Sequence, residues 1–370
     1  MRGDSGAYRL LLALGALDAA GYSVIVPVAP EIADATGAGP ATIGLLVASF
    51  PLGMVAGFWI AGRALERYGS RPLLVSALLL IALGSVGFVL SEALTVYFLA
   101  RVVMGLGSAG VWIGVTFETL ERWPGQEYVC MSRILGAYSV GGLIGPALGA
   151  VGGISGPFTL YLVLVLAAVP LVLAVERPAE RRAFASDRSA LRLRGFWVAG
   201  AAVLFAYLVL GLMEGVLPLH LAERLTQAEI GALYVGLSVV VATSATAAGS
   251  QRPRSMVFGS VLLAVAGITV AGAVAQVPLW CLALALAAAA VGIGSTGSLG
   301  LLVEAVDVQR IVTAMVVWSQ IGIAGYLLGP LVGGTVAEEL GYAATGAVAA
   351  VAGVAVLAAL RVSERARGAC

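Results

Sequence analysis

The sequence predicts an all-α membrane protein with twelve transmembrane helices in two pseudo-symmetric six-helix bundles. Of its 370 residues 60% are hydrophobic and only 11% are charged, and the mean hydropathy is +1.02. Soluble domains carry about a quarter of their residues as charged side chains. An internal repeat predicts the two bundles: Gly141-x-x-x-Gly145-Pro146-x-x-Gly149 recurs as Gly325-x-x-x-Gly329-Pro330-x-x-Gly333, an offset of 329 − 145 = 184 residues. Because that offset is too long for a solenoid repeat, it indicates duplication of a multi-helix unit.

About 20 consecutive apolar residues span a bilayer, and the sequence contains twelve such segments. The first six lie at 10–29, 41–62, 72–91, 94–116, 133–152 and 157–175. The second six lie at 196–219, 229–248, 256–276, 279–303, 311–335 and 342–360. The polar stretch 176–194 separates the two sets and is predicted to be a cytoplasmic linker. We therefore expect an N-terminal bundle over 1–175 and a C-terminal bundle over 195–370.

The distribution of arginine predicts the orientation, because cytoplasmic loops are enriched in basic residues. The even-numbered connections, the 176–194 linker and the C-terminal tail hold most of the basic residues outside the spans, whereas the odd-numbered connections hold mainly acidic ones. Both termini are therefore expected in the cytoplasm, with the chain in the cell membrane as a multi-pass protein.

Composition also limits the partners. The net charge is +1, and the absence of a basic face predicts no nucleic-acid partner. The three cysteines share no spacing typical of metal or redox sites, so no metal and no cofactor are expected. The lipid bilayer is the expected surrounding, and a monomer the expected state. No nucleophile–base constellation is evident, which argues against an enzyme.

A motif with charged residues follows the second predicted helix: Gly62-x-x-x-Glu66-Arg67-x-Gly69-x-Arg71. It resembles the loop signature of the major facilitator superfamily, with Glu66 in place of aspartate and Ser70 in place of a basic residue. The resemblance implies a tight turn at the glycines and a cytoplasmic charge lock between the acid and the arginines. The alternative is a basic cytoplasmic loop with incidental charges.

Two further motifs extend the resemblance. Arg101-x-x-x-Gly105-x-Gly107 is similar to a motif of the fourth helix, in which the arginine is linked to proton coupling. The alternative for Arg101 is a side chain that snorkels to the outer interface. The glycine–proline motif at Gly141–Gly149 resembles the antiporter motif of the superfamily, and its small residues allow two helices to meet at backbone distance and to slide. Its second copy carries Gly325, Gly329 and Pro330.

Two carboxylates lie inside predicted helices. Asp18 is about 12 Å along the first helix from Leu10, near the bilayer midplane. Glu214 precedes Pro218 by four residues and Asp18 precedes Pro27 by nine, which places Glu214 about 7 Å nearer the outside. A carboxylate in a bilayer is costly unless it is paired, solvated or protonated, so either residue is a candidate proton site. The alternative is a structural hydrogen bond or an ion pair with Arg101.

The segments around these acids resemble the first and seventh helices of vesicular monoamine transporters and their drug/proton antiporter relatives. The resemblance implies that Asp18 holds a substrate amine, that Glu214 is protonated during the cycle, and that Tyr326 borders the site. The candidate aromatic walls are Trp318 and Phe50, together with Trp112, Phe117, Tyr138, Tyr207 and Tyr326. Phe50 stands where the relatives have a lysine, and their acidic positions in the tenth and eleventh helices are not acidic here, so the site is expected to carry less charge.

The function we expect is proton-coupled antiport, with export of an organic cation, amine or drug-like, by alternating access and with the proton gradient as the driving force. Protons from outside would neutralise Asp18 or Glu214 and release the cation. One alternative is a proton-coupled carrier of a neutral solute or lipid. A different class of function is a membrane sensor without turnover, which the lack of a cytoplasmic signalling domain in the sequence disfavours.

Overall fold

The computed structural model describes residues 5–123, 126–174, 188–249, 251–307 and 311–368. Within these residues the regular structure is helical, and ten spans are long and apolar enough to cross a membrane. They fall on α3 (Pro40–Tyr68), α4 (Ser70–Leu90), α5 (Leu94–Arg122), α7 (Ser155–Ala174), α8 (Arg194–Gly215), α10 (Gln227–Ala248), α11 (Pro253–Ala273), α12 (Val277–Ala305), α13 (Ile311–Leu340) and α14 (Thr345–Gly368).

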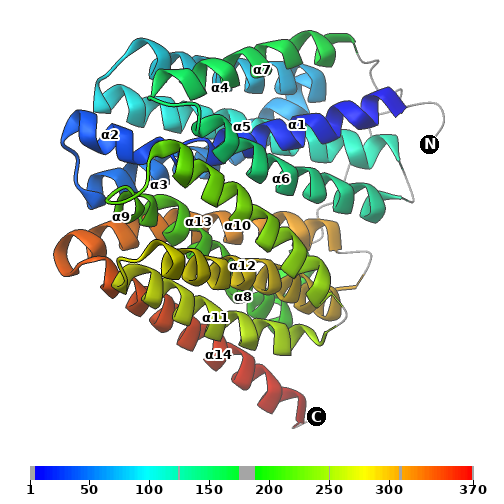
Figure 1. Cartoon of the computed structure of the whole chain (residues 1–370). Coiled ribbons are helices and arrows are strands. Elements are labelled where there is room, and N and C mark those ends of the chain that lie inside the picture. The colour runs from blue at the N-terminus through cyan, green and yellow to red at the C-terminus, as the bar shows by residue number, and fades with distance from the viewer. Residues whose placement is uncertain (1–4, 124–125, 175–187, 250, 308–310, 369–370) are drawn as a thin grey trace. The chain divides into compact units, whose positions relative to one another are not determined.

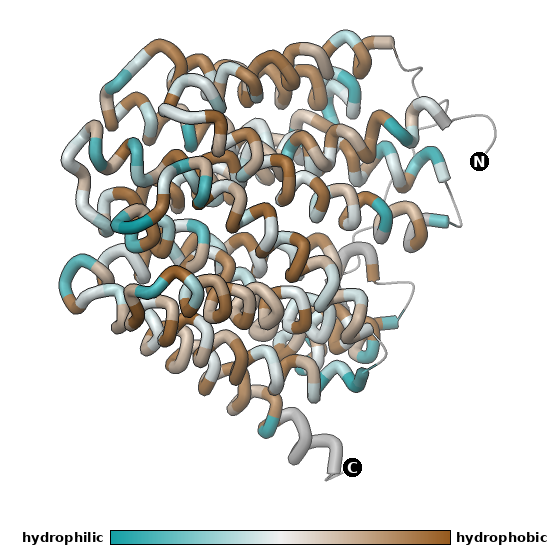
Figure 2. Tube along the Cα trace, viewed as in Figure 1, coloured by the Kyte–Doolittle hydropathy of each residue, from teal (hydrophilic) through white to brown (hydrophobic). Residues whose placement is uncertain are grey.

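Two more long helices complete the predicted set: α1 (Ser5–Ser23), with 19 residues, and α6 (Glu127–Gly149), with 23. With the ten spans they make twelve, in the predicted chain order (Figure 1). The all-α membrane fold is therefore confirmed. Figure 2 shows hydrophilic residues gathered at helix ends and connections, with hydrophobic residues along the helix bodies. Large apolar side chains face outward, including Leu83, which is 61% exposed, and Val351, which is 73% exposed.

Two helices are interrupted just before a proline. The first helix was predicted to continue to residue 29, but α1 ends at Ser23, and a turn leads to α2 (Ala29–Thr36). Helix α8 ends at Gly215, and the short α9 (Leu217–Leu221) follows. Pro27 and Pro218 have no backbone N–H to bond to the carbonyls of Ser23 and Glu214, four residues earlier, and their rings would clash with those carbonyls. The chain therefore leaves the helix five residues after Asp18 and one residue after Glu214.

The chain forms two compact units. Unit 1 comprises Met1–Ala38, Ser49–Phe184 and Leu225–Val235; unit 2 comprises Gly39–Ala48, Ala185–Arg224 and Gly236–Cys370. In unit 1, α1 packs on α5 and α6, and α4 packs on α5 and α7. In unit 2, α8 packs on α12, α13 and α14, and α11 packs on α12 and α14. The predicted linker lies mostly outside the described residues; its end forms the short 3₁₀ helix η1 (Arg188–Arg192). The division into bundles at 176–194 stays a prediction.

Each unit includes one short segment whose neighbours in the sequence belong to the other unit: Gly39–Ala48 in unit 2 and Leu225–Val235 in unit 1. In unit 2, the start of α3 packs on α13: Glu338 Oε2 accepts the backbone N–H of Ala41 at 2.8 Å. A Cβ atom at Gly44 would lie 2.2 Å from the carbonyl oxygen of Pro330, so only glycine fits there. In unit 1, the start of α10 packs on the end of α6, where Gln227 Nε2 donates to the carbonyl of Gly149 at 2.7 Å.

Candidate functional site: two buried carboxylate–tyrosine pairs

Asp18 lies on α1, five residues before the end of the helix, and is 3% exposed. The hydroxyl of Tyr138 on α6 donates a hydrogen bond of 2.8 Å to Asp18 Oδ2. The hydroxyl of Ser108 on α5 also interacts with the carboxylate. Oδ1 is buried and has no partner of good hydrogen-bond geometry in the part of the chain that the structure describes. One oxygen of the carboxylate is therefore held, and the other is available to a donor.

Aromatic rings surround this carboxylate. Trp112 of α5 meets the ring of Tyr138 edge-on, at 5.1 Å between centroids and an interplanar angle of 78°. The ring of Tyr138 also lies against the backbone of α1, because a Cβ at Gly15 would be only 2.9 Å from Tyr138 Cε2. Tyr161 of α7 contacts α1 at Gly21, three residues after Asp18. A Cβ at Gly21 would lie only 1.9 Å from the Tyr161 hydroxyl oxygen. Asp18 thus lies in a buried setting of aromatic rings and hydroxyl groups, and aromatic rings can hold an organic cation.

Arg101 of α5 is fully buried, so it does not snorkel to a surface. Its Nη1 donates to the carbonyl of Gly21 at 3.2 Å and its Nη2 to the carbonyl of Tyr22 at 3.4 Å. The guanidinium also lies over the ring of Phe50, at 4.5 Å from the centroid. Arginine therefore supplies positive charge to the carbonyl end of α1, where the helix dipole favours a cation. Phe50 is 2% exposed, and its ring lies under this arginine.

The second carboxylate lies in unit 2 and has the same kind of partner. Glu214, in the last turn of α8, is 8% exposed, and Tyr326 of α13 is 1% exposed. The hydroxyl of Tyr326 donates to Glu214 Oε2 at 2.8 Å. Trp318, two turns before Tyr326 on α13, is 7% exposed, and its buried Nε1–H has no partner among the described residues. The expected grouping of Glu214 with Tyr326 is therefore present as a direct hydrogen bond.

The two glycine–proline motifs bring each pair of helices to backbone distance. A Cβ at Gly141 would lie 2.1 Å from the carbonyl oxygen of Ala16, and one at Gly145 would lie 2.6 Å from that of Ala20. In the second copy, a Cβ at Gly325 would lie 2.1 Å from the carbonyl oxygen of Leu204. A Cβ at Gly149 would likewise clash with the carbonyl oxygen of Val24, and one at Gly329 with that of Leu208. The motifs therefore bind α6 to α1 and α13 to α8, and these are the helices that carry the two pairs.

The prolines of these motifs lie inside α6 and α13. Pro146 and Pro330 cannot donate to the carbonyls four residues before them, and in α13 that carbonyl belongs to Tyr326. Pro330 also packs on α8, since a Cβ at Gly215 would lie 2.2 Å from its Cβ. Helices α13 and α8, which carry Tyr326 and Glu214, thus each lack a backbone hydrogen bond near these residues. The two helices are also in contact there.

The signature motif predicted as a loop is mostly helical. Helix α3 continues to Tyr68, so Gly62, Glu66 and Arg67 lie in its last turns, and α4 begins at Ser70. Gly69 alone joins the helices; its φ of 87° explains the glycine, because other residues rarely adopt it. Gly62 was expected to allow close helix approach, but a Cβ there meets no described atom within 4 Å. Glu66 and Arg67 are exposed, and Arg71 is half-buried at the start of α4.

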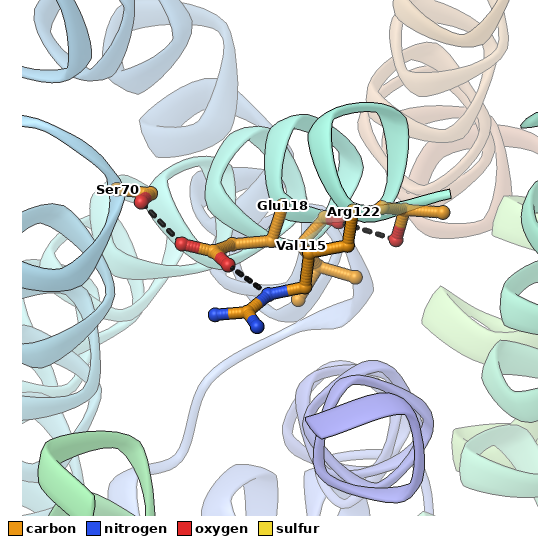
Figure 3. Close-up of polar contacts among 5 residues, drawn as sticks. Ser70, Val115, Glu118 and Arg122 are labelled. Carbon is orange, nitrogen blue, oxygen red and sulfur yellow. Dashed lines mark hydrogen bonds and ion pairs between the residues drawn. The ribbon is translucent and has the colours of Figure 1, made fainter. Parts of the chain in front are cut away.

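A buried polar cluster lies at this junction instead of at Glu66. Ser70 donates a hydrogen bond to Glu118 Oε1, and Arg122 Nε forms an ion pair of 2.7 Å with Glu118 Oε2 (Figure 3). Glu118 and Arg122 are each 7% exposed in their side chains. The sequence analysis missed Glu118 because it placed the end of the helix at residue 116. The signal was present: an acid and an arginine four residues apart lie on one helix face.

The single histidine, His220, packs against several other side chains. His220 on α9 places Nδ1 at 3.0 Å from Glu223 Oε1 and Nε2 at 3.3 Å from the carbonyl of Val274. Its ring stacks on Tyr342 at 4.6 Å and meets Trp280 edge-on at 5.1 Å. The imidazole is therefore a packed part of one end of unit 2.

The sequence of this chain is similar to that of a known protein family. The Major Facilitator Superfamily pattern matches residues 11–250, well over half of the chain. The chain belongs to this superfamily. This membership, together with the long apolar helices, identifies the chain as a multi-pass membrane protein of the superfamily.

The curated relatives and solved structures differ in how much of the chain they cover. The chain is 28% identical over 130 residues to "Multidrug resistance protein 2" of Bacillus subtilis (strain 168), covering 35% of this chain and 32% of the relative. It is 25% identical over 194 residues to "Tetracycline resistance protein, class D" of Salmonella ordonez, covering 47% and 48%. The chain thus spans between a third and a half of these relatives. A bacterial homolog of the human lysosomal transporter Spinster shares the fold, with a TM-score of 0.83 at 16% identity over 99% of this chain and 97% of that one.

Proposed function

We propose that the protein is a proton-coupled antiporter that exports an organic cation, an amine or a drug-like compound, by alternating access. The observation that carries the proposal is Asp18: a carboxylate that is 3% exposed, held at one oxygen by Tyr138, and surrounded by aromatic rings. The drug-resistance relatives support export of such compounds. The resemblance of the segments around Asp18 and Glu214 to vesicular monoamine transporters supports an amine.

The chemistry rests on a balance of charge. An ionised carboxylate in an apolar interior is costly by several kcal/mol unless an opposite charge or a proton neutralises it. A cation and a proton each supply that neutralisation, so the two ligands compete for Asp18. A carrier that binds the cation from the cytoplasm and meets protons outside would then exchange one for the other. The exchange is productive only if the affinity for the cation differs between the two states of the carrier.

Glu214 takes the role of the second proton site in this proposal. It lies in the last turn of α8, next to the break before Pro218, and hydrogen-bonds to Tyr326. The arginine distribution supports both termini in the cytoplasm, which places the α8–α9 break toward the outside, where protons enter. Arg101 then neutralises the carbonyl end of α1 and keeps a fixed positive charge near the first site. The proposal also includes residence in the cell membrane and activity as a monomer.

The experiment is transport by the purified protein in liposomes under an imposed pH gradient. We expect ethidium, a fluorescent organic cation, to accumulate against its gradient on the side that is more acidic, and accumulation to stop when an ionophore removes the pH gradient. A neutral sugar and an organic anion, tested under the same gradient, serve as controls. Accumulation of the neutral compound but not of ethidium would favour the neutral-solute alternative, and binding without any turnover would favour a sensor.

A further inference from the structure

Within the described part of the chain, each unit contains a phenol hydrogen-bonded to a carboxylate, on corresponding helices of the duplicated sequence. In unit 1 the pair is Tyr138 on α6 and Asp18 on α1, and in unit 2 it is Tyr326 on α13 and Glu214 on α8. Both hydrogen bonds measure 2.8 Å. Tyr326 was expected to border the site, whereas Tyr138 was expected only as one of several candidate aromatic walls.

The two pairs lie at different heights in their units. Asp18 precedes Pro27 by 27 − 18 = 9 residues, whereas Glu214 precedes Pro218 by 218 − 214 = 4. Tyr138 precedes Pro146 by 146 − 138 = 8 residues, whereas Tyr326 precedes Pro330 by 330 − 326 = 4. Each member of the second pair is thus displaced in the same direction, by five and four residues, or about one helical turn.

The phenol in unit 1 is held in place by its ring. Trp112 packs edge-on against Tyr138, and the absence of a side chain at Gly15 lets the ring lie on the backbone of α1. The hydroxyl therefore cannot swing far from Asp18. It fixes Oδ2, whereas the buried Oδ1 has no partner of good hydrogen-bond geometry among the described residues, although the Ser108 hydroxyl also interacts with the carboxylate.

We propose that Tyr138 is a positioning residue that sets the competition between proton and cation at Asp18, and that Tyr326 does the same for Glu214. This inference rests on the proposed function. A hydrogen bond donated to an ionised carboxylate is about twice as strong as one between neutral groups. The phenol therefore stabilises the ionised carboxylate more than the protonated one. It keeps the site ready for a cation down to a lower pH than a bare carboxylate at this depth would allow.

The test is a pH titration of ethidium binding to the purified protein, with Tyr138→Phe as the variant. Phenylalanine keeps the ring contacts with Trp112 and Gly15 and removes only the hydroxyl. Loss of a hydrogen bond to a charged group predicts about tenfold weaker binding near the midpoint of the titration. The pH at which binding is half lost should rise by about one unit. Incorporation of 3-fluorotyrosine at position 138, a stronger donor, should move that pH in the opposite direction.

The matched control is Tyr97→Phe, which removes another buried phenol of unit 1, one that stacks on Phe88. It should leave the titration unchanged, and the thermal unfolding midpoint shows that each variant is folded. A folded Tyr138→Phe protein with the titration curve of the wild type would overturn the positioning role alone. A wild-type protein whose ethidium binding is absent, or flat across the pH range, would overturn the proposed function and this inference with it. If Tyr138→Phe does not fold, an unshifted curve for the fluorotyrosine protein overturns the inference.

Discussion

At the scale of single residues, the two carboxylates differ in their surroundings although they share a type of partner. Asp18 lies within α1, five residues before its end, among aromatic rings from three other helices. Glu214 lies one residue before the end of α8, and its own backbone carbonyl is the one that Pro218 cannot bond. The surroundings of Asp18 within α1 are suited to holding a ligand. The position of Glu214 beside a helix break is suited to a group whose protonation changes when the backbone at that break moves.

We therefore expect the two carboxylates to separate in phenotype. Asp18→Asn removes the charge that binds the cation, so equilibrium binding of ethidium should fall by at least a hundredfold, the equivalent of about 3 kcal/mol for a buried, uncompensated cation. Glu214→Gln mimics the protonated state, so binding and exchange should persist while accumulation driven by a pH gradient is lost. Binding assays and proton-driven uptake on both variants measure this. Normal binding by Asp18→Asn together with lost binding by Glu214→Gln would mean that the two roles are reversed.

Sequence reasoning found both acids, because a carboxylate in a long apolar segment stands out without any structure. It also predicted, through a family resemblance, that Tyr326 borders the site. Tyr138 was only one of several candidate aromatic walls, since a tyrosine in a predicted helix gives no indication of the face on which it lies. Phe50 was another candidate wall, and its ring lies under Arg101. Which side chains meet depends on the rotation of each helix about its axis, and a sequence with apolar residues on all faces does not specify that rotation.

At the scale of elements, two pairs of helices hold the carboxylate–phenol hydrogen bonds: α1 with α6, and α8 with α13. In each pair, glycines replace side chains at the contact, so carbonyl groups of one helix lie against the Cα atoms of the other. Such contacts lack interlocking side chains, which is why small-residue faces are suited to helices that slide. The helix breaks before Pro27 and Pro218 occur in the partner helices of both pairs.

A single methyl group tests the role of this contact. In Gly145→Ala, the new Cβ would lie 2.0 Å from Ser23 Oγ and 2.6 Å from the backbone oxygen of Ala20, so α1 and α6 must separate. We expect a loss of about 1–3 kcal/mol in stability from overpacking. Counterflow should slow more than binding weakens, because the carboxylate itself remains. Gly136→Ala is the control on the same helix, since a Cβ there meets no described atom within 4 Å. Counterflow at the wild-type rate in a folded Gly145→Ala protein would show that the contact has no part in turnover.

Helix positions were predicted well from length and hydropathy, but helix ends were not. Helix α5 continues to Arg122 and α13 to Leu340, beyond the predicted ends at 116 and 335. Hydropathy locates the part of a helix that lies in the hydrocarbon region, whereas backbone hydrogen bonds continue past it through polar turns. The cluster of Ser70, Glu118 and Arg122 lies in one such polar extension.

At the scale of the whole molecule, the chain is a duplicated helical membrane protein, and each copy supplies a carboxylate–phenol pair. The repeat was visible in the sequence at an offset of 184 residues, and the two pairs lie on helices that this offset relates. A carrier with one ionisable site in each copy has a separate place for the ligand and for the driving proton. That division is the basis of the proposed exchange.

The central claim is that a cation and a proton compete for the same buried carboxylate. Its most direct test is proton release from the purified protein in weak buffer, followed with a pH indicator while ethidium is added. The account predicts that cation binding releases protons between about pH 5 and pH 8, that binding weakens as the pH falls, and that Asp18→Asn releases none. Tight ethidium binding that releases no proton at any pH in this range would contradict it.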